Sequence, residues 1–202
     1  MACDDYCRLQ VLHLHNNYLT TLPEQLVALH RMRSLAVSFN RFIVLPLVIA
    51  HMTHVQVSDV EVVSLAGNSI ERLSSETLTE LRYTKRLDLR LNELTLPTTD
   101  TLKFVVLERL THLDVRDNRI RELDLHVLRS LEHLSCERNS MVSLRLNGSS
   151  LRSLAAAGNR ECLVRFSYND SCVAAVFVCV ALSLLVLLSC FLCFLFLYEI
   201  VM

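Results

Sequence analysis

LTHLDVRDNRI, residues 110–120, is the stretch of sequence that decides the fold. Its fixed positions are Leu110, Leu113, Val115, Asn118 and Ile120, which give the pattern L-x-x-L-x-L-x-x-N-x-L. Successive side chains of a strand point to opposite faces, so the alternation around Leu113 predicts a short strand with one buried face. The asparagine follows at the point where the chain turns.

The same pattern occurs six more times, the last copy being incomplete. Its asparagines recur at spacings from 20 residues (139 to 159) to 28 residues (40 to 68), and they are Asn17, Asn40, Asn68, Asn92, Asn118, Asn139 and Asn159. This pattern is the signature of the leucine-rich repeat, and a single repeat cannot bury its apolar face alone. The sequence therefore predicts an α/β leucine-rich-repeat solenoid of about seven repeats over residues 9–160, with an inner parallel sheet. We expect the asparagines to form a structural ladder whose side-chain amides satisfy backbone groups of the turns.

The segments that return from one strand to the next differ along the chain. Residues 21–32 and 74–83 have apolar residues at helical spacing, with Pro23 and Ser75 suited to helix starts. The last two intervals between asparagines are only 21 and 20 residues (118 to 139 and 139 to 159). We expect the return segments there to be nearly extended.

The C-terminal part changes character after Asn159. Residues 1–8 form a short lead, and 161–171 are predicted to be a juxtamembrane linker, because Glu161 stands where an apolar residue is needed. Residues 172–198 contain no charge, which predicts a transmembrane helix followed by a tail at 199–202. Arg160 and Arg165 precede this run and no Lys or Arg follows it. With no signal peptide visible, we expect a single-pass, tail-anchored membrane protein with cytosolic repeats.

Composition excludes several functions. The net charge is −1, which argues against nucleic acid as a partner. With only three glycines there is no phosphate-binding loop, and no cofactor is expected. The eight cysteines show no paired C-x-x-C motif, so we expect neither a zinc site nor a disulfide framework.

The solvent-facing positions of the predicted strands are charged in repeats four to six. Towards both ends of the solenoid these positions hold small or weakly polar residues. The charged or titratable residues of repeats four to six are Arg86, Asp88, Arg90, His112, Asp114, Arg116, His133 and Glu137. Stacked parallel strands would place Asp88 beside Asp114 and Arg90 beside Arg116. Two interpretations remain open: a stripe on the concave face that binds a protein partner, or a solvated face whose charges pair with one another.

Catalytic and metal sites are weaker interpretations of the same residues. His112, Asp114, His133 and Glu137 would lie on the flat face of a sheet, where four ligands do not converge tetrahedrally. Ser135 lies between His133 and Glu137 without the strand-turn-helix context of a serine nucleophile. We therefore expect no catalytic, metal-binding or cofactor-binding residue.

Several repeats resemble those of the PH-domain leucine-rich-repeat protein phosphatases. The most specific element is CERN at 136–139, and the others are AVSFNRF (36–42), SLAGNSIERL (64–73), LDLRLNEL (87–94), LTHLDVRDNRIRELD (110–124), LEHLSCERNSMVSL (131–144) and LRSLAAAGNR (151–160). The resemblance covers the repeat region only, without that family's PH domain or its metal-dependent phosphatase domain. It implies a role in binding partners, including signalling kinases such as Akt and protein kinase C.

Our leading hypothesis is a non-enzymatic protein-interaction module, tethered to a membrane through residues 172–198. One alternative is a truncated piece of the Ser/Thr phosphatase itself. Another is a cell-surface recognition protein with its repeats outside the cell.

Overall fold

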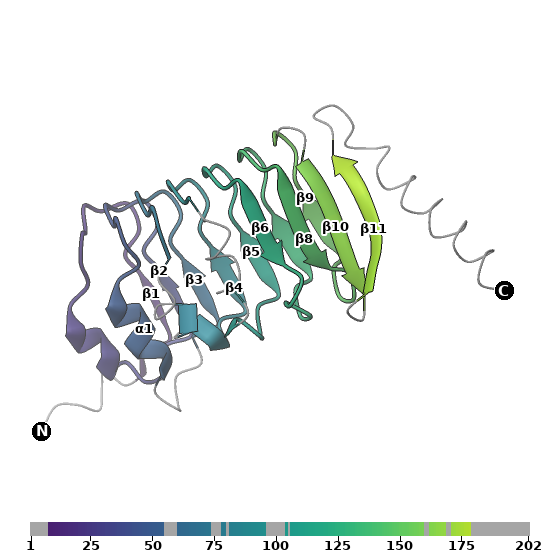
Figure 1. The fold of residues 1–202 in the computed structure, drawn as a ribbon. Coiled ribbons are helices and arrows are strands. Elements are labelled where there is room, and N and C mark those ends of the chain that lie inside the picture. Colours follow the sequence, from purple (N-terminus) through teal and green to yellow (C-terminus); the bar gives the residue numbers. More distant parts are fainter. Residues whose placement is uncertain are drawn as a thin grey trace, which may run out of the picture.

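The repeats stack side by side into an elongated, layered solenoid (Figure 1). The computed structural model describes residues 8–54, 60–73, 78–79, 81–95, 104, 106–159, 162–168 and 171–178. Each repeat contributes one short strand to an inner sheet and returns through an outer layer. The fold predicted from the sequence, a leucine-rich-repeat solenoid with an inner parallel sheet, is confirmed.

The inner sheet has seven parallel strands in chain order. They are β1 (Val11–His13), β2 (Ser34–Ala36), β3 (Val62–Ser64), β4 (Arg86–Asp88), β5 (His112–Asp114), β7 (His133–Ser135) and β9 (Ser153–Ala155). The central residue of each strand from β2 to β7 is buried, as Leu87 and Leu113 illustrate, and the two flanking residues face outward. The alternation read from the sequence thus places one apolar side chain of each strand in the core.

The outer layer changes from helical to extended along the chain. Its helical segments are the 3-10 helix η2 (Glu24–Ala28), α1 (Leu47–His54) and the 3-10 helix η3 (Leu81–Tyr83). Strands β6 (Glu122–Leu125), β8 (Ser143–Asn147) and β10 (Cys162–Tyr168) pair in parallel, and β11 (Ser171–Val178) completes this sheet in the antiparallel direction. Figure 1 shows the helices at the purple and blue end and the longer strands at the green and yellow end. The extended return segments expected from the short repeat lengths are present as β6 and β8.

The C-terminal prediction is wrong where the structure describes it. The sequence predicts a linker at residues 162–168, but they form β10, which pairs with β8 and buries Cys162 and Val164. Residues 172–178 are predicted to begin a membrane helix, but they lie in β11. No helix among the described residues has the length and apolar character needed to cross a bilayer, so the predicted single-pass membrane location is overturned. The rest of that prediction, 179–202, lies outside the described residues.

The membrane-helix prediction fails because an uncharged apolar run is compatible with a buried strand as well as with a helix. Hydrophobic periodicity alone does not distinguish a buried strand from a helix in such a run. In β10, buried Cys162 and Val164 alternate with the less buried Leu163 and exposed Arg165. That spacing of two is the signal of a strand.

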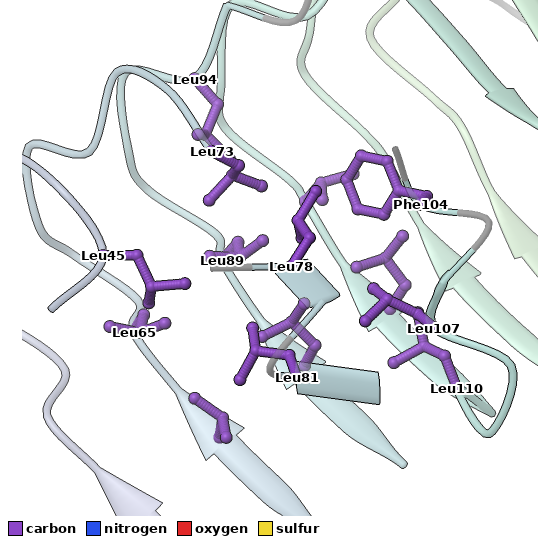
Figure 2. Close-up of a cluster of buried hydrophobic side chains, with 14 of the residues drawn as sticks. Leu45, Leu65, Leu73, Leu78, Leu81, Leu89, Leu94, Phe104, Leu107 and Leu110 are labelled. Atoms are coloured by element: carbon purple, nitrogen blue, oxygen red, sulfur yellow. The ribbon is translucent and has the colours of Figure 1, made fainter. Parts of the chain in front are cut away.

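The core between the two layers consists almost entirely of aliphatic side chains. Figure 2 shows leucines from η3, from the segments that follow the inner strands and from the return segments pointing into the same interior, with Leu89 and Leu94 near Leu73 and Leu78. Phe104 is fully buried and is among the largest side chains of this core. The repeats therefore share one continuous hydrophobic core.

The repeat asparagines connect each turn to the preceding one. Asn118 donates from Nδ2 to three carbonyl oxygens and accepts from a backbone amide through Oδ1. Its partners are Leu89 O at 3.0 Å, Val115 O at 3.1 Å, Arg116 O at 3.0 Å and Leu94 N at 3.0 Å. Asn92 and Asn139 repeat this arrangement one repeat earlier and one repeat later. Because Leu89 and Leu94 belong to the preceding repeat, the ladder fixes the alignment of one repeat on the next.

Candidate protein-interaction face

The eight charged residues singled out from the sequence lie in three columns across β4, β5 and β7. Strand register pairs Arg86 with His112 and His112 with His133, and it pairs Asp88 with Asp114. We call Arg86, His112 and His133 the cationic column, and Asp88 and Asp114 the acidic column. Arg90, Arg116 and Glu137 follow at the C-terminal ends of the three strands. Together these residues form the charged stripe.

The centre of the charged stripe is an ion-pair network around Arg116. Its Nη2 lies 2.6 Å from Asp114 Oδ2, and its Nε donates to Asp114 Oδ1 at 2.9 Å. The same Nε lies 3.7 Å from Glu137 Oε2. The hydrogen bonds from Arg116 to Asp114 raise the pKa of the guanidinium further above its ordinary value. The guanidinium is therefore charged at all physiological pH values, and the hydrogen bonds hold both side chains in place.

Asp88 is held less tightly than Asp114. Its Oδ2 accepts from Ser64 Oγ at 3.2 Å and lies 3.4 Å from Arg90 Nε. Burial is the main cause that raises the pKa of Asp88, and the neighbouring Asp114 carboxylate adds to it, against the lowering effect of Arg90. The two carboxylates therefore disfavour additional negative charge beside them.

The cationic column has a different character. The imidazole rings of His112 and His133 are stacked, with centroids 4.4 Å apart and an interplanar angle of 26°. Burial lowers the pKa of His112, and the positive charge of Arg86 and the His133 ring lower it further. Arg86 is exposed, and no carboxylate among the described residues forms a salt bridge with it. The column thus contains one permanent positive charge and two titratable rings.

An open hollow of about 220 Å³ lies on this face between β3 and β7. Side chains of both columns line it, together with Val62 of β3 and Ser135 of β7. No group of three or more His, Cys, Asp or Glu in the described part of the chain could hold a metal ion. The chemistry available in the hollow is that of hydrogen bonding and charge, on a rigid sheet.

Sequence reasoning missed a row of residues at one border of this face. The residue before each repeat asparagine has a positive φ, including Phe39 (φ 54°), Leu91 (φ 55°) and Asp117 (φ 55°). At Gly67 (φ 64°) a Cβ would lie 2.3 Å from the ring of Phe39, so only glycine fits under that ring. Glycine before asparagine at 67–68 and 158–159 was the signal in the sequence.

Asp117 in the same row forms an ion pair with Arg138 of the next repeat. Arg138 donates from Nε to Asp117 Oδ1 at 2.5 Å and from Nη2 to Oδ2 at 2.7 Å. These hydrogen bonds lower the pKa of Asp117. An ion pair between neighbouring repeats therefore also stabilises the border of this face.

Comparison with known proteins agrees with this architecture. The family model for the Leucine Rich Repeat matches residues 8–29. Two solved structures of similar fold are internalin C2 from Listeria monocytogenes (TM-score 0.56, 20% identity, 80% of this chain and 76% of that one) and the leucine-rich repeat domain of APL1B (TM-score 0.63, 21% identity, 79% and 46%). At these identities the likeness concerns the fold alone.

Two curated relatives are more similar in sequence. PH domain leucine-rich repeat protein phosphatase 1 from Rattus norvegicus is 39% identical over 100 residues, and the corresponding human protein is 36% identical over 100 residues. Each match covers 50% of this chain but only 6% of the relative. The chain is thus a leucine-rich-repeat protein by fold, and its repeats resemble a small part of the PH domain leucine-rich repeat protein phosphatases, as the sequence motifs predicted.

Proposed function

We propose that this chain is a non-catalytic protein-interaction module whose concave face binds a protein partner through the charged stripe. The observation that carries the proposal is that eight charged or titratable side chains gather on three adjacent strands of one sheet and just beyond their C-terminal ends. The neighbouring strands on either side, β3 and β9, present small or apolar residues, such as Val62 and Ala155. The charged side chains are therefore concentrated on one part of the sheet, and the strands beside it present small or apolar residues.

The geometry supports binding because the side chains are already positioned. Arg116 is fixed between Asp114 and Glu137, and Asp88 is fixed by Ser64, so a partner has little side-chain motion to restrict. Preorganised polar groups bind more tightly for that reason. Complementary charges would also steer the encounter and set its orientation.

We propose a signalling kinase as the partner, by analogy with the phosphatases that the repeats resemble. The experiment measures binding of the purified full chain to the kinase domains of Akt and protein kinase C by surface plasmon resonance. Arg90→Glu/Arg116→Glu should weaken binding at least about tenfold, which corresponds to about 1.4 kcal/mol. Arg119→Glu/Arg145→Glu is the matched control, because it makes the same change in net charge at ion pairs away from the stripe.

Thermal unfolding of both double variants would confirm that each remains folded at the assay temperature. Equal loss of binding in the two double variants would contradict the assignment to the concave face. Failure of the unaltered chain to bind either kinase would remove the kinases as partners.

A further inference from the structure

The two positively charged parts of the stripe differ in whether their charge is already neutralised. Arg90 lies 3.4 Å from Asp88, and Arg116 lies 2.6 Å from Asp114. Arg86 has no such partner among the described residues, although its side chain is exposed on the same face. The unneutralised charge of the concave face is therefore at the cationic column, at the edge of the hollow.

The donors of the cationic column suit an anionic oxygen group. A guanidinium offers two parallel N–H donors that match a carboxylate. His112 Nδ1 lies 2.9 Å from Thr111 Oγ1, which orients the ring and leaves Nε2 free to donate when the ring is protonated. The hollow of about 220 Å³ has room for one side chain that reaches Arg86 and the two rings.

The acidic column limits the charge of that group. Asp88 and Asp114 also line the hollow, and their carboxylates repel a further negative charge beside them. A phosphate carries about −1.5 to −2 charges at pH 7, so it would meet nearly twice the repulsion that a carboxylate meets. One carboxylate is the better match to the single permanent charge of Arg86.

We propose that the cationic column is a carboxylate-binding subsite, which takes an Asp or Glu side chain from an extended, acidic segment of the protein partner. The proposal rests on the proposed function and names the chemistry of the partner at that face. An extended segment fits because its alternate side chains point to the same side and would face the sheet together.

Binding at this subsite should couple to proton uptake. The charged groups that face His112 are Arg86 and Asp88 from β4, Asp114 from its own strand, and Glu132 and His133 at β7. In the free protein Arg86 opposes protonation of His112; a bound carboxylate would favour it. The affinity should therefore rise as the pH falls below neutrality, until the carboxylate of the ligand is itself protonated near pH 4.

The test uses the full chain and three fluorescein-labelled heptapeptides of alternating valine and a second residue, which is glutamate, glutamine or phosphoserine. Fluorescence anisotropy should show binding of the glutamate peptide, at least about tenfold weaker binding of the glutamine peptide, and no gain for phosphoserine. Arg86→Gln should weaken the glutamate peptide about tenfold, whereas Arg145→Gln, which removes the same charge from the outer strand β8, should not. NMR titration of the unaltered chain should show the pKa of His112 rising when the glutamate peptide is added.

Equal binding of the glutamate and glutamine peptides, or no effect of Arg86→Gln, would overturn the subsite. Tighter binding of the phosphoserine peptide would overturn the choice of a carboxylate. The proposed function fails separately, because Arg90→Glu/Arg116→Glu tests partner binding through residues outside the cationic column.

Discussion

Replacing one asparagine of the ladder should destabilise the solenoid far more than its size suggests. Asn118 is 8% exposed, and its four contacts involve only two amide protons and one acceptor oxygen. Three hydrogen bonds at roughly 1 to 1.5 kcal/mol each give a loss of about 3 to 4.5 kcal/mol for Asn118→Ala. That is a large part of the roughly 5–15 kcal/mol that stabilises a typical domain.

The matched control is Asn17→Ala in the first repeat. Asn17 is exposed, and within the described part of the chain it donates to Leu14 O and His15 O alone, both at 3.0 Å within its own turn. Its replacement should cost less than about 1 kcal/mol. Urea unfolding followed by circular dichroism measures both variants. If the free energies of unfolding of the two variants differ by less than about 1 kcal/mol, the ladder does not hold the repeats together as argued.

Three further outcomes are expected. Gly67→Ala should destabilise by about 1–3 kcal/mol in urea unfolding, because its Cβ would meet the ring of Phe39 at a positive φ. Arg138→Ala should lower the melting temperature at neutral pH, but not below the folded-state pKa of Asp117. That pKa is lowered in the folded protein, so its contribution is present above the unfolded pKa of about 4 and is lost as the pH falls through the folded value. Val164→Asp should cost several kcal/mol in thermal unfolding, because it buries an unpaired carboxylate in β10.

Each of these three has its own control. Adding Phe39→Ala to Gly67→Ala should recover part of the loss, and strict additivity of the two changes would refute the clash. A deficit of Arg138→Ala that persists unchanged in acid would show that the ion pair is not its cause. Arg165→Asp changes an exposed neighbour in the same strand, and an effect as large as that of Val164→Asp would argue against a buried face of β10.

Repetition makes the inner sheet predictable. The strands at β4, β5 and β7 follow from a fixed spacing of leucines, so the columns of the charged stripe can be assigned from the spacing alone. The electrostatic differences within the stripe cannot, because they depend on rotamers. Nothing in the sequence shows that Arg116 forms a salt bridge with Asp114, whereas Arg86 forms none with any described carboxylate.

The outer layer is less predictable, for a definite reason. Leu163 to Phe166 pair with a strand that lies some 20 residues earlier in the chain, and such pairing leaves little trace in local sequence. The uncharged apolar run after Ser171 has a composition that is compatible with a membrane-spanning helix and with a buried strand, so composition alone leads to the membrane prediction. The alternation of Cys162, Val164 and Phe166 is the local signal that identifies β10.

The change of the outer layer from helices to strands has a consequence for the local curvature of the solenoid. A helix is about 10 Å across, whereas strands stack at about 4.8 Å, so helices on the outside wedge the repeats apart and bend the inner sheet. Where β6 and β8 form the outer layer, both layers advance by the same step and the bend relaxes. The charged stripe lies on β4, β5 and β7, where the outer layer changes from helices to strands. There, the parallel register of β4, β5 and β7 keeps equivalent side chains in line, about 4.8 Å apart, so that an extended ligand could contact them one after another.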